Sequence, residues 1–444
     1  MNHGSVGSDG SSGSGAASVD SAPQSGAGGS TRPALPKGRL VRTWRRGTDG
    51  TGRNQHHGLR LVPGGASERR RRSRRVSALL PIVATAIMVA ACSGSPSSAA
   101  QPAPTIHTVA QVFPQHKGAQ VITLQASHAY TPVSVNGSTD DYHCTLVDPH
   151  LRENSYIVGS HLIPNSPEVH HAITFEVLPA DVPQALAANN HGKGWGCFGE
   201  AGVGQWLSVW APGHGLDMAP KGTGFYFPKG SMVVMQVHYN LFAGDKPTHV
   251  QLKLQTVPAV SSHLIPLHID PIAAPPDIPC PPGVHGPLCS RSASLAKLGY
   301  QWGAPAVSFV DLLEQGCGRD PSNPPGGDTT TCTVPAGFSG EILRIQPHMH
   351  LLGTGMKVTL DPGTAQQRVL LDDTAYNFHY QRSFTMPTPV TVTASDRISV
   401  ECTFDPELDQ ELPQLRRLPP RYVTWGNGSA NEMCLGIVTY IDSR

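Results

Sequence analysis

Three histidine motifs in apolar surroundings offer most of the chemistry in this sequence. His170 and His171 are neighbours, His238 lies in a second strand-like segment, and His348 and His350 flank a methionine. Imidazole nitrogens bind transition metals well, whereas calcium sites need carboxylate-rich loops that the sequence does not show. Taken together, the three motifs favour a transition-metal site.

The spacing of these histidines decides which of them can reach one ion. Residues i and i+2 of a strand point to the same face, so His348 and His350 are expected to reach one ion. Adjacent His170 and His171 would point to opposite faces of a regular strand. They can share an ion only at a strand end or bulge, or through different ring nitrogens. Gln236 lies on the same strand face as the histidine two residues later, where it is a candidate for orienting that ligand.

Each motif also has an ordinary explanation. Histidine pairs are often polar strand residues, a lone histidine such as His238 is often a satisfied core or surface residue, and Gln236 is equally well a polar strand residue. A methionine such as Met433 is more often part of a core than a metal ligand. The metal hypothesis therefore depends on the conjunction of the motifs.

Short strands must position these motifs. The 47 glycines and 41 prolines make up about a fifth of the 444 residues, which argues against helical bundles and coiled coils. Apolar and polar residues alternate with period two in segments such as 250–255 and 398–404, as in strands that are buried on one face. Many such segments predict an all-β fold of two antiparallel β-sandwich domains in tandem, with a jelly-roll-like order of strands.

The expected N-terminal domain spans residues 105–262, and the expected C-terminal domain spans residues 263–444. A segment of about 271–335 interrupts the strand pattern, because it is rich in proline and glycine and holds four cysteines. We expect this segment to form an insert, with short helices around 294–298 and 307–315.

The first 92 residues have the composition of a leader. Residues 1–68 are rich in Gly, Ser, Ala and Pro, offer too little apolar surface to offset chain entropy, and are expected to be disordered. Residues 69–92 combine six arginines, sixteen largely apolar residues and Cys92, in a pattern that resembles the bacterial lipobox. We expect export and lipid anchoring through Cys92 at the outer face of the bacterial cytoplasmic membrane, with residues 93–104 as a flexible tether. The alternative is a basic nucleic-acid-binding arm beside an uncleaved anchor.

Charge argues against nucleic-acid binding by the rest of the chain. Residues 1–91 carry 14 Lys and Arg against 4 Asp and Glu, which leaves 19 basic and 28 acidic residues, a net charge of −9, on residues 92–444. Phosphate binding requires clustered positive charge. No nucleic-acid partner is therefore expected for this part of the chain.

Eight cysteines follow Cys92, and none of them forms a Cys-X-X-Cys pair. An even number in an exported chain is typical of disulfides, so about four bridges are expected. Short separations suggest that Cys280 pairs with Cys289 and Cys317 with Cys332.

Four motifs in a fixed order resemble those of the copper type II, ascorbate-dependent monooxygenases, the family of peptidylglycine α-hydroxylating monooxygenase and dopamine β-monooxygenase. The motifs are His170-His171, Gln236-Val237-His238-Tyr239, His348-Met349-His350-Leu351-Leu352-Gly353 and Asn431-Glu432-Met433-Cys434-Leu435. Asp141-Tyr142-His143-Cys144 stands in place of the family's Tyr-X-Cys. The likeness extends over most of residues 140–442, and with the lipobox the chain is similar to a bacterial lipoprotein member of the family.

The resemblance implies two copper ions per chain. The implied ligands are His170, His171 and His238 for an electron-transfer site, and His348, His350 and Met433 for an oxygen-binding site. The thioether favours Cu(I), the state that meets dioxygen. Two one-electron centres suffice for monooxygenation, and the sequence has no GxGxxG or CxxCH motif for flavin or haem. The resemblance also implies the disulfides Cys144–Cys197 and Cys402–Cys434, the second of which would fix the neighbour of the methionine ligand.

The implied function is hydroxylation of a C–H bond of a small organic substrate by dioxygen, with an external one-electron reductant such as ascorbate. The peptide-amidating branch has an arginine two residues before the His-X-His motif and a tyrosine four residues after the methionine. Gln346 and Ile437 stand at these positions, which puts peptide amidation in doubt. The alternatives are a non-catalytic, surface-tethered copper-binding protein and a structural adhesion lipoprotein. The sequence specifies neither the substrate nor the oligomeric state.

Overall fold

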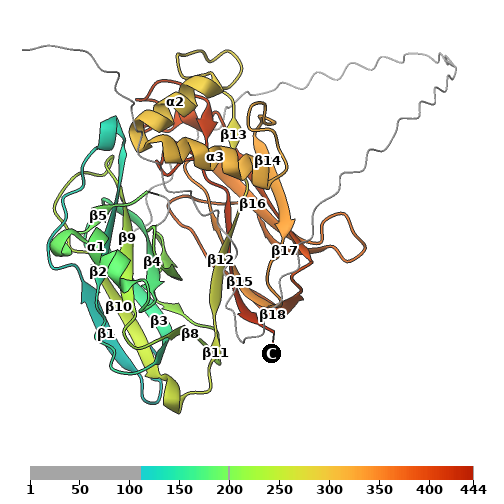
Figure 1. The fold of residues 1–444 in the computed structure, drawn as a ribbon. Coiled ribbons are helices and arrows are strands. Elements are labelled where there is room, and N and C mark those ends of the chain that lie inside the picture. Colours follow the sequence, from blue (N-terminus) through green and yellow to red (C-terminus); the bar gives the residue numbers. More distant parts are fainter. Residues whose placement is uncertain (1–111, 199–200, 444) are drawn as a thin grey trace, which may run out of the picture. The chain divides into compact units, whose positions relative to one another are not determined.

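A computed structural model describes residues 112–198 and 201–443, and strands dominate it (Figure 1). The low-complexity stretch 1–68, the expected signal segment 69–92 with Cys92, and the tether 93–104 lie outside the described residues. Within 112–198 and 201–443, no helix has the length and apolar character needed to cross a membrane.

The N-terminal part of the described chain forms two sheets. The first has the strand order β1-β10-β3-β8-β11, with β7 also paired to β3, and the second has the order β5-β2-β9-β4-β6. Apart from the short parallel pair of β11 with β8, these strands pair in antiparallel fashion. The strands are β1 (Gln120–Gln125), β2 (Asp140–Val147), β3 (Ser155–Ile163), β4 (Val169–Val177), β5 (Trp195–Gly196), β6 (Gln205–Trp210), β7 (Asp217–Met218), β8 (Thr223–Phe227), β9 (Met232–Asn240), β10 (Gln251–Pro258) and β11 (Ile265–Pro266).

Apolar side chains from both of these sheets fill one core. Leu252 and Leu254 of β10 enter it from the first sheet, and Met235 of β9 enters it from the second. Gln251 and Lys253, which alternate with the leucines, are partly exposed. Because burying one leucine side chain contributes about 1.5–3 kcal/mol, the period-two pattern fixes which face of β10 is turned inward.

The C-terminal part forms two four-stranded sheets, β12-β21-β15-β18 and β14-β19-β16-β17, and a short pair of β13 with β20. Ile345 of β15, Val358 of β16 and Val400 of β19 belong to the apolar core that both larger sheets share. The strands are β12 (His268–Ala273), β13 (Asp277–Ile278), β14 (Thr329–Pro335), β15 (Gly340–His348), β16 (Gly353–Leu360), β17 (Arg368–Asp373), β18 (Phe384–Val392), β19 (Arg397–Phe404), β20 (Val423–Thr424) and β21 (Leu435–Asp442).

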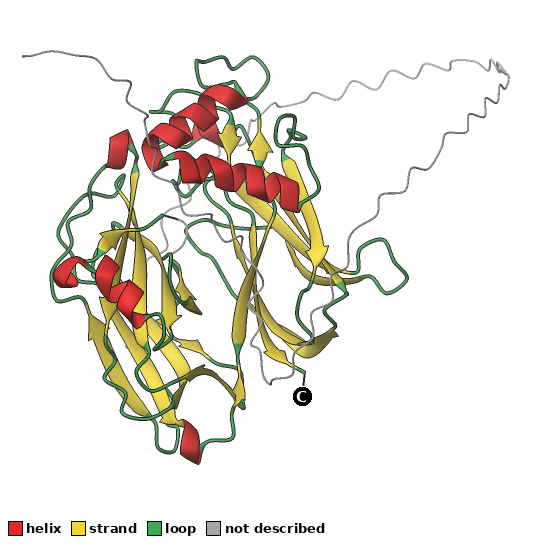
Figure 2. Ribbon diagram, viewed as in Figure 1, coloured by secondary structure: helices red, strands yellow, loops and turns green. Residues whose placement is uncertain are grey.

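The two longest helices, α2 (Arg291–Trp302) and α3 (Ala304–Gly316), follow each other directly (Figure 2). The hydroxyl of Ser290 accepts a hydrogen bond from the backbone of the first turn and so caps α2. Gly303 joins the helices with a φ of 87°, a conformation that a side chain would strain. The shorter helical elements are α1 (Val182–Ala188), α4 (Leu408–Glu411) and three 3₁₀ turns, Val135–Gly137, Asn190–Gly192 and Ala259–Ser261.

The insert expected at about 271–335 is built around α2 and α3, which are both longer than the helices expected at 294–298 and 307–315. Leu298, Val310 and Trp425 pack in one apolar cluster, so the helices gain tertiary contacts that no local pattern shows. The two ends of the insert, in β12 and β14, are strands of the C-terminal sheets.

The all-β class predicted from the sequence is confirmed. The jelly-roll-like strand order and the division into domains 105–262 and 263–444 remain predictions. Near that boundary, β11 pairs with β8 of the N-terminal part, and β12 pairs with β21 of the C-terminal part.

Four disulfides cross-link the described residues in the expected pairs. They are Cys144–Cys197, Cys280–Cys289, Cys317–Cys332 and Cys402–Cys434. Cys402 lies in β19 and Cys434 directly before β21, so this bridge joins the two C-terminal sheets next to Met433.

Removing the Cys402–Cys434 bridge, with both residues changed to Ala, should lower the free energy of unfolding of the C-terminal part by about 3–4 kcal/mol. The bridge spans 32 residues, and a longer closed loop restricts the unfolded chain more. Urea unfolding of the purified full chain measures the loss. The Cys280–Cys289 bridge spans 9 residues, so the same double change there should cost about 2–3 kcal/mol. A larger loss at the shorter bridge would contradict this account.

Candidate metal centre

The first histidine group lies on the neighbouring strands β4 and β9. In the sheet register His238 of β9 stands opposite His171 of β4, and opposite Tyr142 of β2 on its other side. The pairing of β4 with β9 shifts between Val169 and His171. This bulge takes His170 out of the regular ladder, which allows two adjacent histidines to approach one point.

Three imidazole nitrogens of this group converge. The Nδ1 atom of His171 lies 3.3 Å from that of His170 and 3.1 Å from that of His238. Nitrogens that share one ion at about 2 Å each are separated by roughly this distance. One ligand nitrogen from each residue lies within 4.8 Å of the others, and all three residues are buried. The structure thus brings together the three histidines that the resemblance implies for the electron-transfer site.

Asp140, a buried carboxylate at the start of β2, holds the other side of His238. Its Oδ1 accepts a hydrogen bond from Nε2 of His238 at 2.8 Å, so the lone pair of Nδ1 faces the other two histidines. Tyr142 stacks on the same imidazole with ring centroids 4.3 Å apart. Burial raises the pKa of Asp140, but the hydrogen bond and charge of His238, with hydrogen bonds from Ser429 and Thr139, outweigh burial and place this pKa below its usual value.

The second histidine group stands where β15 ends. His348 is the last residue of β15, His350 lies in the turn beyond it, and Met349 between them packs into the C-terminal core. The Nδ1 atom of His348 contacts the side-chain oxygen of Gln381 at 2.8 Å, and that of His350 contacts the carbonyl of Asn431 at 3.1 Å. Because these oxygens can only accept, both Nδ1 atoms carry the proton and both Nε2 lone pairs are left for an ion. Nε2 of His350 is buried and has no hydrogen-bond partner among the described residues.

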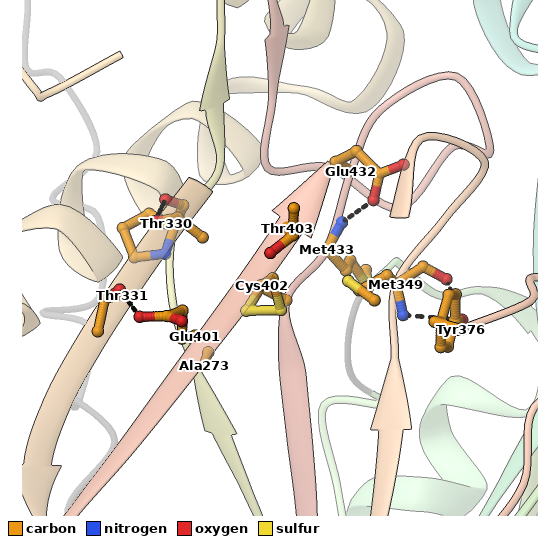
Figure 3. The surroundings of a disulfide bond; sticks show 12 residues. Ala273, Thr330, Thr331, Met349, Tyr376, Glu401, Cys402, Thr403, Glu432 and Met433 are labelled. Carbon is orange, nitrogen blue, oxygen red and sulfur yellow. Dashed lines mark hydrogen bonds between the residues drawn. A yellow bond between two sulfur atoms is a disulfide. The ribbon is translucent and has the colours of Figure 1, made fainter. Parts of the chain in front are cut away.

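Glu432 ties the His348–His350 turn to the segment that carries Met433. Its buried carboxylate accepts hydrogen bonds from the backbone N–H groups of His350 at 2.8 Å, of Leu352 at 2.6 Å and of Met433 at 3.2 Å. Figure 3 shows the bond to Met433 beside the disulfide of Cys402. Burial nevertheless raises the pKa of Glu432 to about 8. The Met433 side chain is buried in the apolar cluster that it shares with α2 and α3.

Burial favours the neutral form of four of these imidazoles, those of His170, His171, His348 and His350. Desolvation lowers the pKa of His348 to about 4 and that of His350 to about 3. The pKa values of His170 and His171 lie well below the usual value, because burial and the neighbouring histidines both disfavour the charged ring. A neutral imidazole offers a lone pair, so these side chains are in the state that binds metals.

The two histidine groups adjoin each other in one buried cluster. The ring of His171 lies 5.1 Å from that of His348, and the ring of His238 lies 6.5 Å from that of His350, measured between centroids. Phe378 of the C-terminal part stacks on His170 at 4.0 Å. Strands from both parts of the chain therefore contribute to the same centre.

Gln236 is buried two residues before His238, and its amide donates to the sulfur of Cys197 at 3.8 Å. The side chain that accepts a hydrogen bond from Nε2 of His238 is Asp140, which the sequence motifs did not single out. The signal that could have found Asp140 is its position two residues before Tyr142, on the same strand face. Glu432 could have been found because it lies inside one of the four motifs. Gln381 has no such signal, since it is 33 residues away from its histidine partner.

The donors of both groups fit copper. Imidazole nitrogens suit both copper states, a thioether suits Cu(I), and no oxygen ligand of the kind that calcium or magnesium prefers is among the six implied ligands. The buried, unpaired Nε2 of His350 and the convergent nitrogens of the first group are what a metal site requires.

The family comparison matches the C-terminal part. Residues 328–443 match the family model described as "Copper type II ascorbate-dependent monooxygenase, C-terminal domain". This range includes the His348–His350 turn, Glu432 and Met433. The resemblance to the family is therefore confirmed, on the domain that carries the second histidine group.

Other comparisons add no functional information. The search of curated proteins finds no match. Among solved structures, the major capsid protein P2 from bacteriophage PM2 is 8% identical, with a TM-score of 0.29, and the match covers 73% of this chain and 99% of that one. Allantoicase from Saccharomyces cerevisiae is 10% identical, with a TM-score of 0.17 and coverage of 72% and 90%. These likenesses are too weak to carry an argument.

His171→Ala should reduce the copper content of the purified protein from two ions per chain to one. The Nδ1 atom of His171 faces both other nitrogens of its group, so its loss leaves no three-ligand set there. Metal analysis after anaerobic loading with Cu(I) measures the content. His128→Ala, at an exposed position, is the control and should keep two ions. Two ions retained in His171→Ala, or both lost, would contradict two separate ligand sets.

Proposed function

We infer, from a chain whose residues 328–443 carry the C-terminal domain of the copper type II ascorbate-dependent monooxygenases, that this protein is a two-copper monooxygenase. It hydroxylates a C–H bond of a small organic substrate, with dioxygen and an external one-electron reductant such as ascorbate. The observation that carries the proposal is the meeting of two buried histidine groups from different parts of the chain, with ring centroids as close as 5.1 Å.

The overall reaction sets what these residues must do. Insertion of one oxygen atom into C–H and reduction of the other to water takes two electrons and two protons besides dioxygen. Two bound copper ions would supply one electron each and a binding place for dioxygen. His348, His350 and Met433 are the proposed ligands on the oxygen side, and the three histidines of β4 and β9 are those on the electron-transfer side.

The protein positions the proposed ligands and excludes water from the reacting centre. Gln381 and Asn431 fix the tautomers of His348 and His350, so each ring presents the same nitrogen without rearrangement. Glu432 holds the turn and the methionine segment together. All of these side chains except Asn431 are buried, which shields the reacting centre from side reactions with water.

A small cavity lies between the two parts of the chain, and none of the six implied ligands lines it. Gln346 and Ile437 line it, together with apolar residues of the N-terminal part such as Leu207. The guanidinium of Arg344 also lines it, but donates to Asp217 at 2.5 Å and to the carbonyl of Met218 at 2.7 Å. The cation in this cavity is therefore already paired, and the cavity, with a volume of about 20 Å³, holds little more than one water molecule.

Copper-loaded protein should consume oxygen only when a reductant is supplied, and His348→Ala should abolish this consumption. An oxygen electrode, with ascorbate as the reductant, measures the rate. His128→Ala should match the unchanged protein. A protein that binds two coppers but consumes no oxygen above that of free copper would be a copper carrier, which is the competing interpretation.

We further propose that the protein is exported and lipid-anchored through Cys92 at the outer face of the bacterial cytoplasmic membrane. The support is the sequence of residues 69–92, which lie outside the described residues. Two acyl chains give stable anchoring, at roughly 0.8 kcal/mol per buried CH₂ group.

Mass spectrometry of the mature N-terminus tests the anchor. The expected product begins at a diacylated Cys92, and Cys92→Ser should leave an unacylated chain that no longer partitions with membranes. An unmodified Cys92 in the mature protein would refute the anchor and leave the copper proposal untouched.

A further inference from the structure

The carboxylate of Asp140 is shared between the first histidine group and the C-terminal part. Its Oδ1 accepts from Nε2 of His238 at 2.8 Å and from the hydroxyl of Ser429 at 2.7 Å. Its Oδ2 accepts from the backbone N–H of Ser429 at 3.0 Å and from the hydroxyl of Thr139 at 2.7 Å. Asp140 is fully buried, and these four donors satisfy it without water. Ser429 is 289 residues away along the chain.

Tyr142 makes the same connection from the next position on that face of β2. Its ring stacks on His238, and its hydroxyl donates to the carbonyl of Asn427 at 2.8 Å. The loop lies very close to the strand, since a Cβ atom added at Gly428 would stand 3.2 Å from Oδ2 of Asp140. Residues 427–429, here called the bridging loop, therefore rest directly on the residues that hold a ligand of the first group.

The bridging loop leads within a few residues to the second group. The carbonyl of Asn431 contacts Nδ1 of His350, and Glu432 accepts from the N–H groups of His350 and Met433. Gly428 and Asn431 are also joined by a backbone hydrogen bond of 2.8 Å. A shift of the bridging loop would therefore move the groups that orient His350 and Met433.

We infer that Asp140 is a positioning residue for both proposed copper sites: it orients His238 and anchors the bridging loop, and so couples the two sites through one buried carboxylate. The inference rests on the two-copper function proposed above. A carboxylate that accepts from a ligating imidazole raises the basicity of that ligand. Its negative charge also favours Cu(II) over Cu(I), so it lowers the reduction potential of the first site.

Asp140→Asn tests the inference, with copper alone as the probe. One oxygen of the carboxylate becomes an NH₂ group, so the side chain cannot accept both from Nε2 of His238 at one position and from the backbone N–H of Ser429 at the other. We expect the Cu(I) affinity of the first site to fall about 10- to 100-fold. The midpoint potential of that site, followed through its Cu(II) electron paramagnetic resonance signal, should rise. A residue with a merely structural role would not shift this potential.

Hydrogen exchange measures the coupling itself. In the unchanged protein, copper bound at the first site should slow exchange of the amides of the bridging loop, because it stiffens His238 and hence Asp140. Asp140→Asn should remove this copper-dependent slowing. Ser429→Ala should weaken it while the first site keeps its affinity within about twofold, and it serves as the second variant if Asp140→Asn fails to fold. Thr139→Ala is the matched control, since it removes a hydrogen bond to the same carboxylate without touching the C-terminal part.

The outcomes separate this inference from the proposed function. A chain that binds no copper would overturn both. A chain that binds two copper ions, but in which Asp140→Asn leaves the affinity, the potential and the copper-dependent exchange unchanged, would overturn only the role of Asp140. Equal effects of Thr139→Ala and Ser429→Ala on exchange would also overturn it, because the effect would then be general loosening of the carboxylate.

Discussion

Burial of five histidines in one place is the constraint on which the rest of the centre depends. Burial disfavours the charged form of His170, His171, His348 and His350, and a neutral ring has one nitrogen that donates and one that accepts. The protein supplies an acceptor for the donating nitrogen of His238, His348 and His350, through Asp140, Gln381 and Asn431. The remaining lone pairs face inward, where only a donor or a metal can satisfy them.

Strand geometry explains how ordinary sheets produce this arrangement. A regular strand would separate His170 from His171, and the bulge between Val169 and His171 removes that restriction. At the end of β15, Met349 enters the C-terminal core, while His348 and His350 on either side of it lie next to His171 and His238 of the first group. The bulge in β4 and the end of β15 together explain why the centre lies between sheets from both parts of the chain.

Whether a feature of the fold or of the centre could be predicted from the sequence depends on how far apart along the chain the interacting residues lie. Alternation within strands and short separations between cysteines are local signals, and they predicted the all-β class and the pairs Cys280–Cys289 and Cys317–Cys332. The pairs Cys144–Cys197 and Cys402–Cys434 were implied by the resemblance to the family. The resemblance implied the two ligand groups, and the structure brings the imidazoles of His170, His171 and His238 together. The contact between the groups was not predicted, because it depends on pairings such as that of Asp140 with Ser429, across 289 residues. The full lengths of α2 and α3 were missed because tertiary packing against Trp425 supports them.

Covalent and hydrogen-bonded restraints act on the same segments, which implies a centre that is formed before any metal binds. The Cys144–Cys197 disulfide lies on β2 two residues from Tyr142, and Cys434 adjoins Met433 in the other bridge. Hydrogen bonds to Asp140 and Glu432 then fix the loops next to these bridges. In small zinc domains the metal supplies much of the folding free energy, since the unfolded chain has no site. Here the apolar cores of both parts and the disulfides of Cys144 and Cys434 hold the segments that carry the ligands, so most of the binding free energy of copper remains available to set its affinity and potential rather than to fold the chain.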